Sequence, residues 1–346
     1  MRPIALFLVS RIDKPYDYTS PMMTKTNLKH FVLMLMAVLA MASCGGDDES
    51  GGGGTPTPTP SANANCNDAS KNSVYARLEF PKLKGGSNNI VIVHQASFGV
   101  NYCVEWDSDL RPAGWNAEGS LRAQRWSCYQ MHAGNTSNAT DRKPRDTSSE
   151  FSEYPNDPDL PARYHFTEDP YWGTGYDHGH IIASADRAYS YNNKANMQTF
   201  YMTNMQPQVN GFNSKVWATM EAQVRRWNSN SFRDTLYVVK GGTIDRSDQI
   251  ITTIGRGQNK IPVPKFFFMA LLCKKGSNST SGGYRALGFW IQHKSNSTAD
   301  LRPYVVNIDE LEQLTGIDFF CNLPDKFENV VESLPKEQVL RAWNLE

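Results

Sequence analysis

The chain has 346 residues, and its 35 lysines and arginines balance 35 aspartates and glutamates, which gives a formal net charge of zero. This balance excludes nucleic-acid binding through a global basic charge, but it leaves open a local basic groove. The length allows one large domain or two modest ones.

The amino-terminal region is typical of a secretion signal. Two lysines precede an apolar run over residues 31–43, which is shorter than the ~20 residues of a transmembrane helix but suits a signal-peptide core. Small residues directly before Cys44 resemble a bacterial lipobox. We therefore expect residues 23–44 to form a lipoprotein signal peptide with Cys44 lipidated after cleavage, and residues 1–22 to reflect a misassigned start.

The segment that follows predicts a tether. Residues 45–70 contain a run of glycines and a Thr-Pro repeat, so they cannot bury apolar surface. An acidic run from Asp47 to Glu49 resembles the surface-export signals of some Gram-negative lipoproteins. We expect an exported protein, lipid-anchored to the outer membrane of a Gram-negative bacterium, with one folded domain over residues 71–346.

The folded region opens with segments rich in β-branched and aromatic residues, which predict strands. These predicted strands are residues 74–80, 90–94, 100–106 and 125–131. The segment over residues 132–170 is dense in Asn, Ser, Thr, Asp and Pro, and we expect it to be mostly loop. Its basic cluster contains Arg142, Lys143 and Arg145, which suits either a solvated loop or a phosphate contact.

Five cysteines follow Cys44 in the sequence. They are Cys66, Cys103, Cys128, Cys273 and Cys321. Their spacing matches no zinc-binding pattern, and an oxidising compartment would permit disulfides. Because Cys103 and Cys128 both lie in strand-like segments of the same region, we expect these two to pair. An odd number leaves one thiol free, and the remaining connectivity stays open.

A histidine pair lies in the next predicted strand, residues 176–184. His178 and His180 are separated by one residue, so their side chains point to the same face of a strand. Gly179 leaves the opposite face bare, which permits close approach of a neighbouring chain or a ligand. A second short strand is predicted over residues 199–203.

A helix is predicted from Asn213 to Asn228. Its apolar stripe, which we expect to face the core, consists of Val216, Met220, Val224 and Trp227. An adjoining stripe consists of Asn213, Trp217, Glu221 and Arg225. Taken alone, Asn213 is an ordinary helix N-cap, and Glu221 with Arg225 is an ordinary surface pair. Their position after the histidine strand favours a functional site instead.

The carboxy-terminal third continues the same domain. Strands are predicted over residues 237–241, 266–273 and 287–292, and helices from Ile308 onward. Together with the preceding elements, they predict one mixed α+β domain.

Three linked motifs carry a family resemblance. They are Asp177-His-Gly-His180, Asn204-Met-Gln-Pro-Gln208 and Asn213-x-x-x-Trp217-x-x-x-Glu221. In order and type, they resemble the signature of the sugar-nonspecific DNA/RNA endonuclease family, the ββα-metal or His-Me finger nucleases. The resemblance spans about residues 90–295. It departs from the family pattern at His178, where the family usually has an arginine that helps to hold phosphate.

The resemblance implies a ββα-metal (His-Me finger) fold, α+β with a mainly antiparallel sheet and flanking helices. It implies that His180 is the general base, because neutral imidazole accepts protons near pH 7. Asn213 would be the only direct protein ligand of one Mg²⁺, for which Mn²⁺ can substitute, and Glu221 would act on that ion through water. Asn204 or a backbone carbonyl would hold the other nitrogen of His180, and His178 would donate to phosphate while protonated.

The expected partners are the backbones of DNA and RNA, bound without sequence specificity. Arg225 would contact the phosphate, and Arg142, Arg145 and Arg187 are the candidate substrate-binding arginines. Hydrolysis would leave 5′-phosphate products.

Two other classes of protein stay open. One is an inactive nucleic-acid-binding lipoprotein on the same scaffold, although a decayed site is expected to lose His180 or Asn213 and both remain. The other is a zinc enzyme that uses His178 and His180, although the sequence identifies no third ligand.

Overall fold

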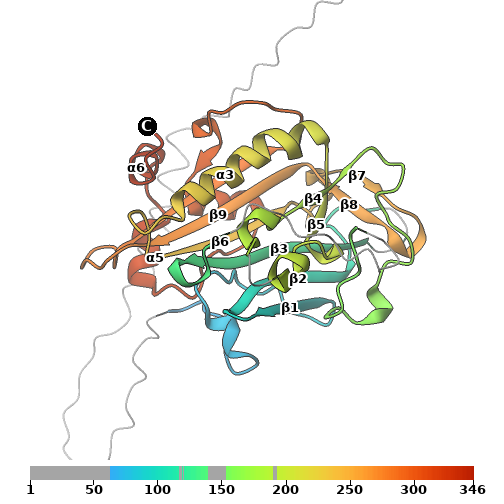
Figure 1. Cartoon of the computed structure of the whole chain (residues 1–346), viewed down its shortest axis with the longest axis horizontal. Helices are drawn as coiled ribbons and strands as arrows, with labels where there is room; N and C mark the ends of the chain where they lie inside the picture. Colours follow the sequence, from blue (N-terminus) through green and yellow to red (C-terminus); the bar gives the residue numbers. More distant parts are fainter. Residues whose placement is uncertain (1–62, 117–118, 120, 139–152, 190–192) are drawn as a thin grey trace, which may run out of the picture. The chain divides into compact units, whose positions relative to one another are not determined.

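A seven-stranded sheet forms the centre of the protein, shown as a computed structural model in Figure 1. Its strand order is β1-β2-β3-β6-β9-β10-β11, and every neighbouring pair is antiparallel. The structure describes residues 63–116, 119, 121–138, 153–189 and 193–346. The predicted lipidation site Cys44, most of the predicted tether, and Arg142 and Arg145 lie outside these residues.

The strands of the large sheet are β1 (Asn89–Ala96), β2 (Gly99–Leu110), β3 (Leu121–His132), β6 (Thr235–Gly242), β9 (Phe266–Lys274), β10 (Tyr284–Gln292) and β11 (Val305–Val306). Two small antiparallel pairs are formed by β4 (Asp177–His180) with β5 (Met205–Gln208), and by β7 (Ile250–Ile254) with β8 (Ile261–Pro264). The helices are α2 (Asn193–Gln198), a π-helical turn (Phe212–Trp217), α3 (Ala218–Trp227), α4 (Ile308–Thr315), α5 (Asp325–Val331) and α6 (Lys336–Ala342).

Side chains alternate between two cores on the two faces of the sheet. Val238 and Phe267 belong to the core that α3 covers, and their neighbours Val239 and Phe268 belong to the core on the other face. The apolar stripe predicted for the helix is buried in the first core, and Figure 1 shows α3 lying over the sheet. Residues of α4 and α5 join the second core. The two helical layers therefore lie on opposite faces.

Most predicted strands are confirmed, but two are wrong. Residues 74–80 begin in a 3₁₀ turn, Ser73–Ala76, because the side chain of Asn72 accepts a hydrogen bond from the backbone of Val74. Residues 199–203 form turns, and the second strand is β5 instead. β5 contains Pro207, which a strand that pairs on one side only tolerates.

The ordered amino-terminal segment packs against the carboxy-terminal region. Asn63 donates to the carbonyl of Leu323 at 2.7 Å, and Asn65 donates to Asp318 at 2.9 Å. Asn63 and Asn65, which fall within the tether predicted for residues 45–70, therefore contact the folded domain. Among the described residues, no helix combines the length and the apolar character needed to cross a membrane.

The predicted cysteine pair is adjacent but not bonded. Cys103 and Cys128 lie directly opposite each other on β2 and β3. Both are buried free thiols in the structure. Burial, and then the hydrogen bond and charge of Cys103, raise the pKa of the Cys128 thiol well above its usual range. The predicted disulfide is therefore not formed here.

Candidate active site

The histidine strand, its partner strand and the following helix form one ββα unit. In the β4–β5 pair, Asp177 lies opposite Gln208 and His180 lies opposite Met205. Two hydrogen bonds then attach the helix to β4. Asn213 Nδ2 donates to Asp177 Oδ2 at 3.0 Å, and Trp217 Nε1 donates to the carbonyl of His180 at 3.1 Å. The unit therefore brings all three sequence motifs into direct contact.

Asn213 lies in the π-helical turn that precedes α3. The backbone N–H of Ala218 bonds to the carbonyl of Asn213, five residues earlier, and such turns are frequent at functional sites. A carboxylate only accepts, so the bond to Asp177 assigns Nδ2 to that side. Asn213 Oδ1 is then the amide atom left to accept or to ligate. An amide oxygen of this kind suits Mg²⁺, so the residues present fit a hard cation.

His180 ends β4 and is half-buried against aromatic rings. Its imidazole meets the ring of Phe200 edge-on at a centroid distance of 4.9 Å and an angle of 88°, and the ring of Tyr154 at 6.0 Å. Both histidines of the strand contact Tyr154, which confirms that they share one face. On the other face, a Cβ at Gly179 would lie 2.4 Å from Gln208 Cδ, so only glycine lets β5 approach.

Asn204 does not hold the ring of His180 through any hydrogen bond that the structure describes. The Asn204 side chain is fully buried and bonds to backbone atoms. Its Nδ2 donates to the carbonyls of Ile182 at 3.0 Å and Thr199 at 2.7 Å, and its Oδ1 accepts from the N–H of Ile182 at 3.0 Å. It therefore fixes the backbone that leaves β4, and it is a positioning residue.

His178 is enclosed between two tyrosine rings. Its imidazole stacks on Tyr154 at 3.9 Å and on Tyr171 at 4.0 Å, and its Nε2 donates to Asp169 Oδ1 at 3.1 Å. Burial opposes ionisation of Asp169, but the hydrogen bond and charge of His178 hold the pKa of that carboxyl below its usual value. Both ring faces and one nitrogen are thus engaged. This arrangement argues against the expected phosphate contact and favours packing.

Arg225 is anchored at one edge by a buried carboxylate. Its Nη1 donates to Asp186 Oδ1 at 2.9 Å, while one third of its side chain remains exposed. Asp186 also accepts from the Tyr129 hydroxyl at 2.6 Å and pairs with Lys240 at 3.6 Å. Burial opposes ionisation of Asp186, but Lys240 and Arg225 hold its pKa below the usual value. The anchored guanidinium keeps further donors for a ligand.

The prediction that Arg187 binds substrate is wrong. Arg187 is fully buried, and its guanidinium donates to the carbonyls of Asn101 at 2.8 Å and Gln130 at 3.0 Å. It also lies over the ring of Tyr129, at 4.8 Å from the centroid. The segment that follows β4 is buried, so the guanidinium of Arg187 bonds to backbone carbonyls of β2 and β3. Glu221 lies half-buried on α3, where the sequence placed it.

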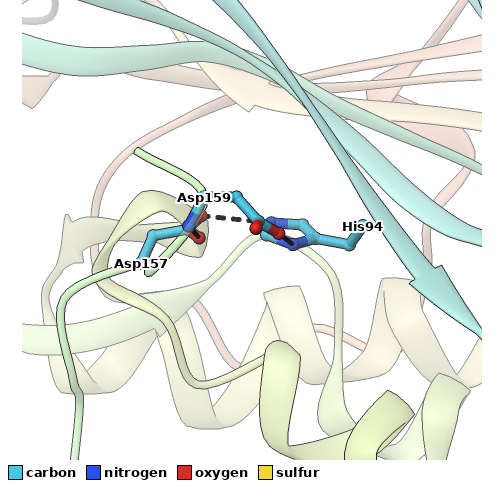
Figure 2. Close-up of side chains that lie close together, drawn as sticks. All are labelled: His94, Asp157 and Asp159. Carbon is cyan, nitrogen blue, oxygen red and sulfur yellow. Dashed lines mark hydrogen bonds and ion pairs between the residues drawn. The ribbon is translucent and has the colours of Figure 1, made fainter. Parts of the chain in front are cut away.

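A buried histidine fixes the loop that encloses His178. His94 of β1 is fully buried, with Nδ1 at 3.2 Å from Asp159 and Nε2 at 3.1 Å from Asp157 (Figure 2). His94 Nε2 lies close enough to Asp157 for an ion pair, but the contact does not have the geometry of a hydrogen bond. Asp157 also accepts from the hydroxyl of Thr203, directly before Asn204. The cluster therefore connects β1, the loop carrying Tyr154 and the turn that leads into β5.

Several of these residues were missed by the sequence analysis. Asp177 is the first residue of the histidine motif, and this position was the sequence signal that could have identified it as a site residue. The loop residues Tyr154, Asp169 and Tyr171 gave no spacing signal, because a loop has no periodicity that would align them with β4. Neither of the two groups of three potential metal ligands in the described part of the chain contains His178 or His180, so a zinc site on these histidines gains no support.

Comparisons with known proteins agree with this geometry. A profile of the family described as DNA/RNA non-specific endonuclease matches residues 115–326. A "Nuclease" from a Nostoc species is 29% identical over 221 residues, which cover 63% of this chain and 73% of that protein. "Nuclease C1" from Cunninghamella echinulata is 30% identical over 180 residues, 50% of this chain and 68% of that protein. "Nuclease EXOG, mitochondrial" from Homo sapiens is 26% identical over 209 residues, 58% of this chain and 53% of that protein.

A solved structure supports the fold. A crystal structure of the EndoG/EndoGI complex, described in terms of EndoG inhibition, aligns with a TM-score of 0.51 at 21% identity. The alignment covers 70% of this chain and 89% of that chain. The α+β architecture with a mainly antiparallel sheet is confirmed by this likeness.

Proposed function

Because the chain belongs to the DNA/RNA non-specific endonuclease family, we propose that it hydrolyses phosphodiester bonds inside DNA and RNA. The observation that carries the proposal is the attachment of the Asn213 helix to the histidine strand by the bonds to Asp177 and to the His180 carbonyl. That attachment places a candidate base and a candidate metal ligand in one rigid unit. Rigid support of this kind is what a catalytic constellation needs.

The reaction follows from the residues of this unit. His180 accepts a proton from a water molecule, whose oxygen attacks phosphorus while the bond to the 3′ oxygen breaks. The proton then leaves with the 3′ hydroxyl, and the phosphate stays on the 5′ end. Arg225, held by Asp186, contacts the phosphoryl oxygens.

We propose that Mg²⁺ is the metal, with Mn²⁺ as a substitute. Asn213 Oδ1 would be its direct ligand, and Glu221 would act through a coordinated water. When bound, the ion neutralises negative charge at the phosphate and the departing oxygen. Asp177 keeps the amide oxygen of Asn213 turned outward for this purpose.

An exposed tryptophan supports a nucleic-acid substrate. Trp172 is 88% exposed and directly follows Tyr171, which stacks on His178. Aromatic rings bind single-stranded bases by stacking, at about 1–3 kcal/mol for each base and with little sequence preference. We propose that Trp172 stacks on an unpaired base beside the scissile phosphate. This contact would hold the strand without reading its sequence.

The proposal is tested by cleavage of supercoiled plasmid and of a structured RNA. The purified protein should nick both in Mg²⁺, stop in EDTA and resume on addition of Mg²⁺ or Mn²⁺. Mapping of the cut ends should give 5′ phosphates without a sequence preference. A metal-loaded protein that binds DNA but leaves both substrates intact would contradict the assignment and favour a binding role.

We further propose that the protein is an exported lipoprotein anchored to the outer membrane. The apolar run over residues 31–43, the small residues before Cys44 and the glycine-rich segment support this proposal. A surface nuclease on a tether would reach nucleic acid outside the cell.

A further inference from the structure

An acidic pocket lies on the face of the sheet opposite the nuclease site. Its volume is about 490 Å³. Five carboxyl side chains line it, and they are Asp309, Glu312, Asp318, Glu328 and Glu332. They come from α4, from the segment after it, and from α5 with the residue that follows. None of the residues lining the pocket is a lysine, an arginine or a histidine. No cationic side chain therefore lies among these carboxyl groups in the pocket lining.

Three of these carboxyl groups converge on one point. One oxygen from each of Asp309, Glu312 and Glu332 lies within 4.8 Å of the other two. Oxygens that share one Ca²⁺ lie 2.3–2.6 Å from the ion, so roughly 5 Å is the largest separation that they can have. The observed spacing fits this limit. It is also the spacing at which unscreened carboxylates repel each other strongly.

Two buried oxygens at the pocket point to a ligand. Glu332 is only 4% exposed, and its Oε1 has no hydrogen-bond partner among the residues that the structure describes. Asn65 Oδ1, also at this pocket, is buried without a hydrogen-bond partner as well. A buried acceptor that is left unpaired destabilises the fold, so such atoms need an explanation. A cation bound among the three carboxyl groups would satisfy Glu332 Oε1.

Burial and mutual repulsion disfavour ionisation of two carboxyl groups in the pocket. Burial, and then repulsion from Glu312 and Glu328, raise the pKa of Glu332 to about 10. Burial, which the backbone N–H of Phe319 partly offsets, and then Asp318 and Asp309 raise the pKa of Glu312 to about 8. The carboxyl groups of the pocket therefore disfavour negative charge at this spacing, and a bound cation would offset that cost.

We propose that this pocket is a calcium site, separate from the nuclease centre, with Asp309, Glu312, Glu332 and Asn65 as its ligands. Calcium takes 6–8 oxygen ligands in flexible geometry, and the roomy pocket leaves space for waters to complete the shell. Magnesium needs a compact octahedron at 2.0–2.1 Å, which side chains from three separate segments fit poorly. Zinc prefers nitrogen and sulfur ligands, which this pocket lacks.

Calcium at this site would hold the segment that contains Asn65 against the helices of the carboxy-terminal region. Asn65 belongs to the segment that enters the domain, and Asp309 lies at the start of α4. The carbonyl of Glu332 already accepts from the backbone N–H groups of Ile308 and Asp309. A single ion would therefore join the entering segment, α4 and the end of α5. Loss of the ion would loosen all three.

The test uses the full-length chain with Asn213→Ala, so that metal binding at the nuclease centre does not contribute. After removal of metal with EDTA, calcium, magnesium or spermidine is added, and binding is measured by titration calorimetry and thermal unfolding. We expect one Ca²⁺ to bind at least ~10-fold more tightly than Mg²⁺. At 100-fold excess over its Kd, it should raise Tm by about 5 °C.

Matched variants decide the assignment. Glu332→Gln and Glu312→Gln should abolish the calcium response, and Asn65→Ala, nearer the surface, should weaken it. Glu310→Gln on the exposed side of α4 should leave it unchanged. No calcium response in the parent chain, an equal response to Mg²⁺ or spermidine, or a response that survives in Glu332→Gln would overturn the proposal. Plasmid cleavage by Glu332→Gln with an intact Asn213 should stay normal, which separates this site from the nuclease function.

Discussion

Asp177 Oδ2 lies 3.0 Å from Asn213 Nδ2, and this hydrogen bond decides which end of the Asn213 amide faces outward. The bond crosses from β4 to the π-helical turn, so it also sets the angle at which the helix begins. In the proposed function, Asp177 would therefore act on the metal through Asn213. Residues in such supporting positions are worth about 10–100-fold in metal affinity.

The first prediction separates the ligand from its support. Asn213→Ala should lose activity as severely as His180→Ala, whereas Asn213→Asp keeps part of it through a carboxylate oxygen.

Asp177→Ala should raise the Mg²⁺ concentration for half-maximal cleavage by about 10-fold or more. Asn210→Ala is the control, because Asn210 also donates to Asp177 but is exposed, and it should behave like the wild type. An unchanged Mg²⁺ requirement in Asp177→Ala would remove Asp177 from this role. Glu221→Gln should be milder, since an amide still orients a water.

The second prediction concerns the base. His180→Ala should lower kcat by at least ~10²-fold, the usual contribution of a general base, with DNA affinity retained. The ring lies against Phe200 and Tyr154, so the truncation leaves a small gap beside these rings. Single-turnover cleavage and fluorescence anisotropy of labelled DNA measure the two quantities. A purified variant that cleaves nearly as fast as the wild type would assign the base elsewhere.

The third prediction concerns the residue that departs from the family pattern. If His178 held phosphate, His178→Arg would help most at alkaline pH, where free imidazole above pH ~6.5 is uncharged. The structure instead stacks His178 on Tyr154 and Tyr171 and pairs it with Asp169. We therefore expect the variant to change the cleavage rate by the same factor at pH 6 and pH 9. A gain confined to pH 9 would restore the phosphate role.

The sequence predicted the histidine strand and the Asn213 helix better than the contacts that surround them. The histidine strand, the Asn204 turn and the Asn213 helix were recognisable because each carries its own residue spacing. Asn204 was assigned to the ring of His180, but a fully buried amide bonds the nearest backbone groups, and these belong to Ile182 and Thr199. The motif placed the residue correctly and left its partner undetermined.

Other errors arise from interactions between segments distant in the chain. Arg187 looked available for phosphate, yet the carbonyl that binds its guanidinium belongs to Asn101, on a different strand. The stretch over residues 74–80 alternates like a strand, but no sheet edge pairs with it, and Asn72 caps a 3₁₀ turn there instead. The local sequence pattern indicates which secondary structure a segment favours. Whether a strand or a side chain finds a hydrogen-bonding partner depends on residues elsewhere in the chain.

The fourth prediction concerns the anchor. Cys44→Ala should release the protein from the membrane fraction or misdirect it, because stable binding needs two lipid chains or more on that residue. Metabolic labelling with palmitate and membrane fractionation measure the two effects. Ser43→Ala is a suitable control, because it keeps a small residue before the cysteine. Unchanged fractionation together with absent label in the wild type would contradict the proposal.

The fifth prediction is a pH dependence of stability that originates at His293. The Nδ1–H of His293 donates to the carbonyl of Pro264 at 2.8 Å, and its Nε2 accepts from the N–H of Val209 at 2.8 Å. Burial lowers the pKa of His293, and the Pro264 carbonyl offsets this only in part. The folded chain thus binds this proton less readily than the unfolded chain, whose histidines titrate near pH ~6.5.

The sign follows by linkage. The stabilisation from neutral His293 is fully present above about pH 6.5 and is lost as the pH falls through the lower pKa of the folded state. His293→Gln keeps a polar side chain but removes the titration. The wild type should therefore exceed the variant in Tm by the largest margin near pH 8, and this margin should shrink toward pH 5. Other titrating groups are common to both proteins and cancel in the difference. A margin that stays constant between pH 5 and pH 8 would show that protonation of His293 does not destabilise the segment that leads from β5 into the Asn213 turn.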